Sequence, residues 1–134
     1  MKLSALMIVN AIVAAVFGIG FVLAPGQVMS LYSPEASVTL DLMCQLFGAA
    51  LIAFAALSWV ARNAPDSEAR RAIVLALFVG DLVGCVVALL AQLRGVVNAL
   101  GWSTVLIYLL LAVGFGYFTF AAKPEPRQKH GPAM

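Results

Sequence analysis

Residues 72–93 read AIVLALFVGDLVGCVVALLAQL, an apolar run that contains one charged residue, Asp81. A bilayer core is crossed by roughly 20 apolar residues of helix, so this run is long enough to span a membrane. Three further apolar runs lie around it, at residues 3–24, 38–61 and 103–122. In hydrocarbon each run must be helical, because unpaired backbone groups are costly there. The sequence therefore predicts an all-α fold, an integral membrane four-helix bundle.

The composition points to a membrane location as well. Of the 134 residues, 63% are hydrophobic and 10% are charged, whereas soluble domains carry about 25% charged residues. A soluble chain of this size buries too small a fraction of its surface to hide so much apolar area. The formal charge of +2 is too small to suggest a nucleic acid partner. We expect a single membrane domain over residues 1–122, in contact with the lipid bilayer, and a disordered cytoplasmic tail over residues 123–134.

Basic residues are distributed unevenly between the two sides of the predicted spans. Seven of the eight Lys and Arg residues lie before the first span, between the second and third spans, or after the fourth span. The other side holds Arg94. The positive-inside rule then places both termini in the cytoplasm of a multi-pass protein, and we expect the bacterial inner membrane. The outer connection at residues 25–37 carries no basic residue and suits a short helix at the interface.

Asp81 lies near the middle of its span and therefore near the bilayer midplane. An acid there costs on the order of 2.5–3.5 kcal/mol and usually faces the interior of a bundle. One interpretation is a proton-binding carboxyl or a polar contact for a ligand. The favoured interpretation is structural, a protonated or hydrogen-bonded Asp that joins two helices, because burial readily neutralises a carboxyl. Asn10, at a similar depth in the first span, is the expected hydrogen-bond partner.

A stripe of small residues adjoins Asp81 at helical spacing. Gly80, Gly84 and Ala88 follow one another at four-residue intervals, and Ala76 extends the stripe by one turn. Such stripes let two membrane helices approach closely. We therefore expect Asp81 to border a tight helix–helix contact.

A second polar stripe begins the span at residues 38–61. Asp41, Gln45 and Gly48 are spaced at i, i+4 and i+7, and Asp41 lies about one turn inside the outer surface. Arg94 ends its span at the same surface. An ion pair between Asp41 and Arg94 would lock the second span to the third, and we favour this role because charges at span ends commonly anchor helices. The alternative is a polar mouth that admits a ligand.

Residues typical of metal and cofactor sites are sparse. His130 is the only histidine, so a bis-histidine haem is excluded and a histidine-based metal site is disfavoured. Cys44 and Cys85 lie inside apolar spans and form no CxxC motif. Buried cysteines usually behave as small apolar residues. We expect no metal, no cofactor and no disulfide.

Several short motifs resemble those of the small bacterial four-helix membrane proteins grouped as DoxX-like, and of related families of unknown function. The motifs are Gly18-Ile19-Gly20-Phe21 leading to Ala24-Pro25, Leu31-Tyr32, Gln45-Leu46-Phe47-Gly48-Ala49 and Gly101-Trp102. The resemblance covers most of the chain, chiefly through hydropathy and loop lengths. This chain departs from related sequences at Gln45, where they often have an arginine. The resemblance implies a four-helix bundle and no particular activity.

Three functions compete on these observations. The leading hypothesis is a non-catalytic accessory or assembly subunit that packs against a membrane-protein partner or a second copy of itself, because the sequence has no nucleophile–base pair, metal cluster or nucleotide motif. The alternative is a small oligomeric carrier or channel with Asp81 as its proton- or ion-sensitive group. The third is a membrane enzyme acting on a lipid or quinone, for which a lone carboxyl is thin support, since acid–base catalysis needs a positioned partner.

Overall fold

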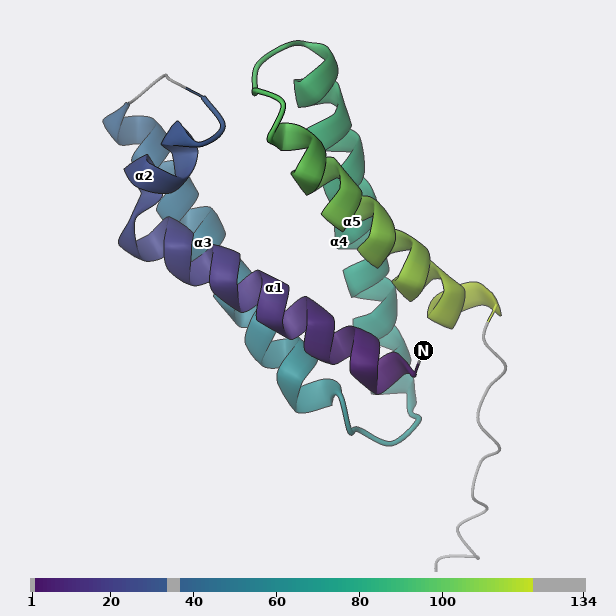
Figure 1. Cartoon of the computed structure of the whole chain (residues 1–134). Coiled ribbons are helices and arrows are strands. Elements are labelled where there is room, and N and C mark those ends of the chain that lie inside the picture. Colours follow the sequence, from purple (N-terminus) through teal and green to yellow (C-terminus); the bar gives the residue numbers. More distant parts are fainter. Residues whose placement is uncertain (1, 34–36, 122–134) are drawn as a thin grey trace, which may run out of the picture.

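The computed structural model describes residues 2–33 and 37–121, and this part of the chain is all-helical (Figure 1). In chain order the elements are α1 (Leu3–Leu23), α2 (Pro25–Ser30), α3 (Val38–Ala61), α4 (Glu68–Leu93), α5 (Gly101–Gly116) and a π-helical end, η1 (Tyr117–Ala121). The described part includes four helices long and apolar enough to cross a membrane, namely α1, α3, α4 and α5 together with η1. The all-helical fold and the four long apolar helices predicted from the sequence are thereby confirmed. The predicted tail at 123–134 lies outside the described residues.

Local capping signals set the starts of two long helices. The side-chain oxygen of Ser37 accepts a hydrogen bond from the backbone N–H of Leu40 at 3.0 Å, at the start of α3. Ser67 caps α4 in the same way, through the N–H of Arg70 at 3.2 Å. These bonds satisfy backbone donors that a helix leaves unpaired at its first turn. Because the cap precedes the apolar run, α4 begins a turn earlier than the predicted span.

The long helices are arranged as two pairs. In the described part of the chain, α1 packs along α3 and α4 packs along α5, while contacts between α1 and α5 join the two pairs. Figure 1 shows the pairs converging near the N-terminus and diverging towards α2 and the α4–α5 connection. We call these the α1/α3 pair and the α4/α5 pair.

The two pairs meet in an apolar core at their converging end. Met7 of α1 and Phe115 of α5 are fully buried there. The other buried members of this core are Leu6, Ala61, Val74, Leu77 and Leu111. All four long helices contribute to it, so this core holds the two pairs together.

The closest crossing within the α1/α3 pair lies at two glycines. A Cβ atom added to Gly48 would lie 2.8 Å from the carbonyl oxygen of Gly18, and one added to Gly18 would lie 2.9 Å from the carbonyl oxygen of Gly48. Real Cβ atoms do not approach backbone so closely, and small residues are what let membrane helices pack at this distance. Gly48, which the sequence placed in a polar stripe, is therefore a helix-packing residue.

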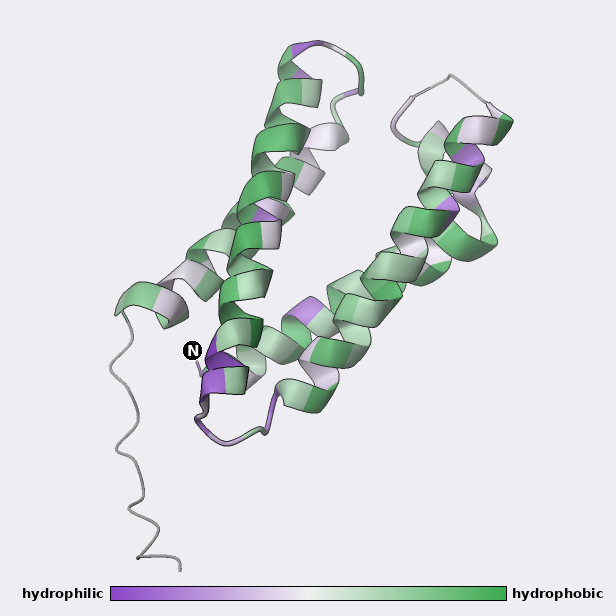
Figure 2. Cartoon of the chain, turned by 180° about the vertical axis from the view of Figure 1, so that it is seen from behind, coloured by the Kyte–Doolittle hydropathy of each residue, from purple (hydrophilic) through white to green (hydrophobic). Residues whose placement is uncertain are grey.

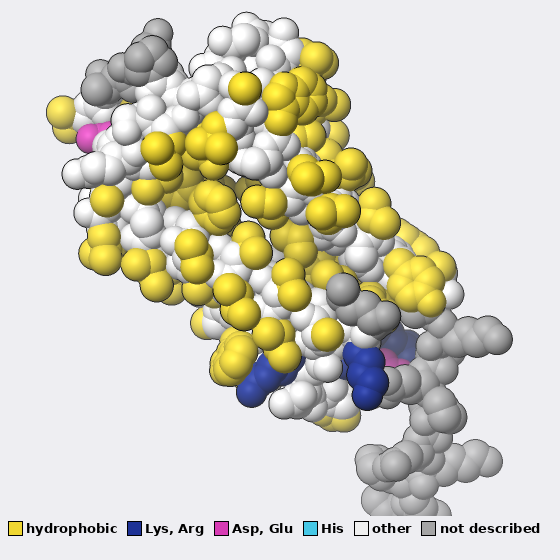
Figure 3. Space-filling model, viewed as in Figure 1, with side chains coloured by type: hydrophobic (Ala, Val, Ile, Leu, Met, Phe, Trp, Pro, Cys, Tyr) yellow, Lys and Arg dark blue, Asp and Glu magenta, His cyan; other side chains and the backbone are white. Residues whose placement is uncertain are grey.

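Apolar side chains cover most of the outer surface of the long helices. Many large hydrophobic residues are more than half exposed, among them Val16, Val60 and Val87. Figure 2 shows hydrophobic residues along the full length of the helices, with hydrophilic residues gathered at the α3–α4 turn. On the face drawn in Figure 3, the visible Lys and Arg side chains also lie at that end of the molecule.

Candidate functional site

A cavity of about 250 Å³ lies between the α1/α3 pair and the α4/α5 pair. Its wall is mostly apolar and is built from α1, α3, α4 and α5, with Met29 of α2 and Tyr32 of the loop that follows it. The polar side chains in the wall are those of Asn10, Tyr32, Asp81, Thr104 and Tyr108. In Figure 3, hydrophobic side chains surround a recess between the two pairs. The divergence of the pairs thus leaves a partly open apolar space beside the core.

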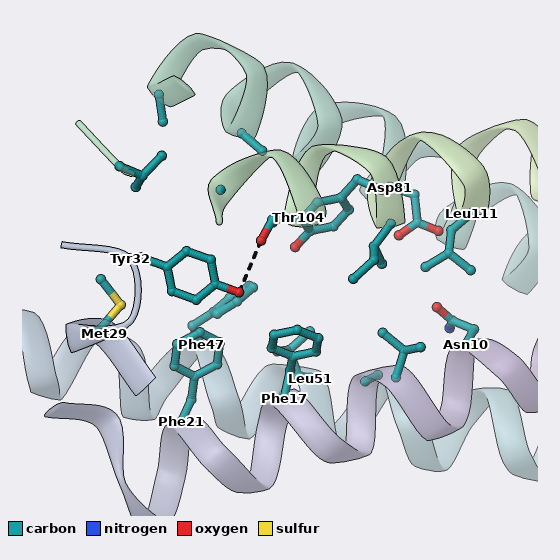
Figure 4. A pocket seen from close by; sticks show the side chains of 18 residues that line it. Asn10, Phe17, Phe21, Met29, Tyr32, Phe47, Leu51, Asp81, Thr104 and Leu111 are labelled. Carbon is teal, nitrogen blue, oxygen red and sulfur yellow. Dashed lines mark hydrogen bonds between the residues drawn. The ribbon is translucent and has the colours of Figure 1, made fainter. Parts of the chain in front are cut away.

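Asp81 of α4 is the charged residue of the cavity wall. The residue is 9% exposed, and its Oδ2 atom is buried with no hydrogen-bond partner among the described residues. Figure 4 shows the carboxyl directed towards the cavity, with Asn10 on the opposite wall. A buried polar atom without a partner is uncommon in folded proteins and calls for an explanation.

Asn10 makes its hydrogen bond within its own helix pair. Its Nδ2 atom donates to the Oγ atom of Ser58 on α3 at 2.8 Å, and Ser58 is fully buried. The expected hydrogen bond between Asn10 and Asp81 is absent from the hydrogen bonds of the described residues. The reason is the helix pairing: α1 packs along α3, whereas Asp81 belongs to the other pair and faces Asn10 across the cavity.

The small-residue stripe of α4 divides among three environments. Gly84 lies against the ring of Tyr108, since an added Cβ would be 2.5 Å from Cε1 of that tyrosine. Ala88 lines the cavity. Gly80 is exposed, and a Cβ added there would meet no atom within 4 Å, so the expected packing contact at Gly80 is not made within the described chain.

The second polar stripe does not reach the cavity. Gln45 donates from Nε2 to the carbonyl oxygen of Val22 at 3.2 Å and so ties α3 to the end of α1. The carboxyl of Asp41 lies beside Gly26 of α2, where an added Cβ would be 3.7 Å from Oδ2. Arg94, the C-cap of α4, is exposed.

The expected ion pair between Asp41 and Arg94 is not formed. The salt bridge found in the described part joins Arg71 to Asp66 at 3.3 Å, in the α3–α4 turn. Since α3 and α4 belong to different, diverging pairs, the start of α3 and the end of α4 are not packed against each other as the ion pair would require.

The end of the cavity next to the α4–α5 connection is bounded by hydrogen bonds that the sequence did not predict. The backbone N–H of Asn98 donates to the carbonyl oxygen of Tyr32 at 2.9 Å. The side-chain Nδ2 of Asn98 donates to the carbonyl oxygen of Leu31 at 2.6 Å. Thr104 Oγ1 donates to the Tyr32 hydroxyl at 3.4 Å, drawn as a dashed line in Figure 4. We call this group the outer clasp. Its main acceptors are backbone carbonyls, which carry no sequence signal.

Aromatic rings line the part of the cavity next to the outer clasp. Phe17 and Phe21 of α1 and Phe47 of α3 contribute to the wall, and the Phe21 and Phe47 rings lie 5.7 Å apart in an edge-to-face arrangement. In Figure 4 these rings and Tyr32 gather at one end, with Asp81 and Asn10 at the other. The i, i+4 spacing of Phe17 and Phe21 was the available sequence signal that the two rings share one helix face.

Among the described residues, the cysteines and the metal-ligating residue types form no additional site. Cys44 and Cys85 are both free thiols. Within residues 2–33 and 37–121, no group of three or more His, Cys, Asp and Glu side chains is placed to hold a metal ion.

No family model, curated protein or solved structure matches this chain. The DoxX-like resemblance stays a prediction, and the functional argument is built on the cavity and its residues.

Proposed function

We propose that this chain is a multi-pass integral membrane protein that holds a small lipid-soluble molecule, without transforming it, in the cavity between its helix pairs. The observation that carries the proposal is an apolar cavity with a single buried, unpartnered carboxyl oxygen in its wall. Apolar pockets with a few convergent polar groups are typical sites for small ligands.

The membrane location is supported by the surface of the long helices. Large hydrophobic side chains are exposed on every long helix, where lipid would cover them. Among the described residues, Lys2, Arg62, Arg70 and Arg71 lie before α1 or around the α3–α4 turn, and Arg94 lies at the other end. This asymmetry favours cytoplasmic termini, and with the resemblance to DoxX-like proteins it favours the bacterial inner membrane.

Binding is favoured over catalysis by the chemistry of the wall. General acid–base chemistry requires an acid or base together with a positioned partner. The wall offers the Asp81 carboxyl, an amide already bonded to Ser58, and hydroxyl groups. Such groups orient a ligand but do not form a nucleophile–base pair.

The role of an accessory or assembly subunit is the second candidate. Gly80 is exposed on α4 with open space around it, next to the exposed Ala76. Small residues on the outer face of a membrane helix permit close approach of another helix. A stable complex with another membrane protein, or a homo-oligomer, after purification in mild detergent would support this role. Loss of that complex in Gly80→Leu would locate the contact.

The ligand-binding proposal is tested by purification followed by native mass spectrometry. We expect the mass of the wild-type protein to include that of a bound small apolar molecule. Ala88→Phe, which places a ring in the cavity, should lose it. Ala76→Phe is the matched control, because it makes the same change on an exposed face of the same helix. Absence of any bound molecule from wild type, or equal retention in Ala88→Phe, would contradict the proposal.

A further inference from the structure

The charge of the cavity wall is one-sided. Asp81 contributes a carboxyl, and no Lys, Arg or His is among the wall residues. Asn10 uses its amide nitrogen on Ser58, so the group that it can still offer a ligand is its carbonyl oxygen. Asn10 and Asp81 therefore present acceptor oxygens at this end of the cavity, and the Tyr108 hydroxyl, which lies near Asp81 in the same wall, can donate or accept. A ligand group that satisfies the two acceptor oxygens donates hydrogen bonds or carries positive charge.

The opposite end of the cavity suits an apolar body. Phe17, Phe21 and Phe47 line it, with Tyr32 closing the space beneath the outer clasp. Aromatic faces attract organic cations as well as burying apolar area. The cavity is thus polarised along its length, with acceptor oxygens at one end and rings at the other.

The length of the cavity is set by the helices that border it. Wall residues extend from Asn10 to Phe21 on α1 and from Asp81 to Ala91 on α4. At 1.5 Å per residue these stretches measure about 15 Å. The occupant is therefore elongated, with one polar end.

Inorganic cations fit this wall poorly. Hard metal ions are held by six or more oxygen ligands, whereas the side chains at this end of the cavity offer one carboxyl, one amide oxygen and the Tyr108 hydroxyl. The described residues contain no metal-binding cluster. An organic cation is satisfied instead by one carboxylate and by carbon contacts around its substituents.

We propose that the cavity binds a lipophilic organic cation, with its charged nitrogen at Asp81 and its apolar body against the aromatic end. This inference rests on the proposed function, because it names the chemical class of the molecule held in that cavity. It explains the unpartnered Oδ2 atom of Asp81, since an ionised acid buried without a counter-charge is costly and a bound cation supplies one.

Calorimetric titration of the purified protein in non-ionic detergent tests the inference, with detergent-only titrations subtracted. The probes are n-octyltrimethylammonium, n-octanol and n-octyl sulfate, which share one alkyl chain and differ in charge. We expect wild type to bind the ammonium at least about tenfold more tightly than octanol, a difference of about 1.4 kcal/mol. The sulfate should bind most weakly. In Ala88→Phe, whose cavity is filled, ammonium binding should be lost.

Asp81→Asn should abolish the preference for the ammonium over octanol, because it replaces the carboxylate with a neutral group of nearly the same shape. Asp41→Asn is the matched control, since this half-buried acid on α3 does not line the cavity, and the preference should persist.

The outcomes separate this inference from the proposed function. Equal binding of ammonium and octanol by wild type, or an undiminished preference in Asp81→Asn, would overturn the cation while leaving a cavity that takes apolar molecules. Ammonium binding that survives in Ala88→Phe would place the cation elsewhere and overturn the inference. Failure of wild type to bind any of the three probes would overturn both proposals.

Discussion

Two buried polar groups face each other across the cavity and differ in how they are satisfied. Asn10 has a buried hydrogen-bond partner in Ser58, whereas the Oδ2 atom of Asp81 has none among the described residues. The first group stabilises the α1/α3 pair, and the second is available to a ligand. Removing the hydrogen bond of Asn10 should therefore lower the stability of the protein, whereas replacing the carboxyl of Asp81 should not.

Ser58→Ala should lower the free energy of unfolding by about 1 kcal/mol, the order of an interhelical hydrogen bond between membrane helices. The physical reason is that the Asn10 amide loses its acceptor while remaining buried. Ser103→Ala is the matched control, because the Ser103 hydroxyl is exposed and donates locally to the carbonyl oxygen of Leu100. Thermal unfolding in detergent measures the midpoints of both variants. An equal shift in the two midpoints would show that the Asn10–Ser58 hydrogen bond does not stabilise the protein.

Asp81→Leu should leave the thermal midpoint of the ligand-free protein unchanged or raise it. The substitution removes a buried oxygen that has no partner, and Asn10 keeps its bond to Ser58. If Asp81 instead joined two helices by a hydrogen bond, Asp81→Leu would remove that bond and lower the thermal midpoint. A fall in the midpoint as large as that of Ser58→Ala would show that the carboxyl is structural.

Among the helices, α4 shows how one element serves several roles on different faces. Its small residues meet a tyrosine ring at Gly84, line the cavity at Ala88 and face outward at Gly80. Sequence spacing places all of these residues on one stripe. The packing of α5 against α4 decides which of them is in contact.

Gly84→Leu should destabilise the α4/α5 pair far more than Gly80→Leu. A side chain at Gly84 would push into the ring of Tyr108, whereas one at Gly80 enters open space. Leu89→Ala, which trims a half-exposed residue of the same helix, should also be milder than Gly84→Leu. Size-exclusion chromatography and thermal unfolding in detergent measure the effect. Equal behaviour of Gly84→Leu and Gly80→Leu would mean that Tyr108 moves aside at no cost.

In the whole molecule, two helix pairs share a core at one end and are joined by the outer clasp at the other, with the cavity between them. The ends also differ in their number of basic residues, because Arg62, Arg70 and Arg71 lie around the α3–α4 turn, whereas the connection between α4 and α5 carries Arg94 alone. The positive-inside rule makes this difference a prediction of orientation.

Cysteine labelling in intact cells checks the orientation, in a chain whose Cys44 and Cys85 are replaced by Ala. A membrane-impermeant maleimide should label Ala99→Cys, in the α4–α5 connection, and should leave Asn63→Cys, in the α3–α4 turn, unmodified until the cells are lysed. A reporter fused after Met134 should be active in the cytoplasm. The reverse labelling pattern would invert the proposed topology.

The four apolar runs and their approximate bounds were predictable from the sequence, because they depend on local composition measured against a fixed membrane thickness. The sequence did not predict how the helices pair, and so it did not predict the Asn10–Ser58 hydrogen bond, the Gly18–Gly48 crossing or the cavity. Helices that are apolar on nearly every face give little indication of which neighbour each face meets. Asp81 and Asn10 were recognisable as buried polar residues, but their partners depend on which helices pair. The tertiary structure decided that, by packing α1 on α3 and α4 on α5, and so left the Asp81 carboxyl facing a space instead of a side chain.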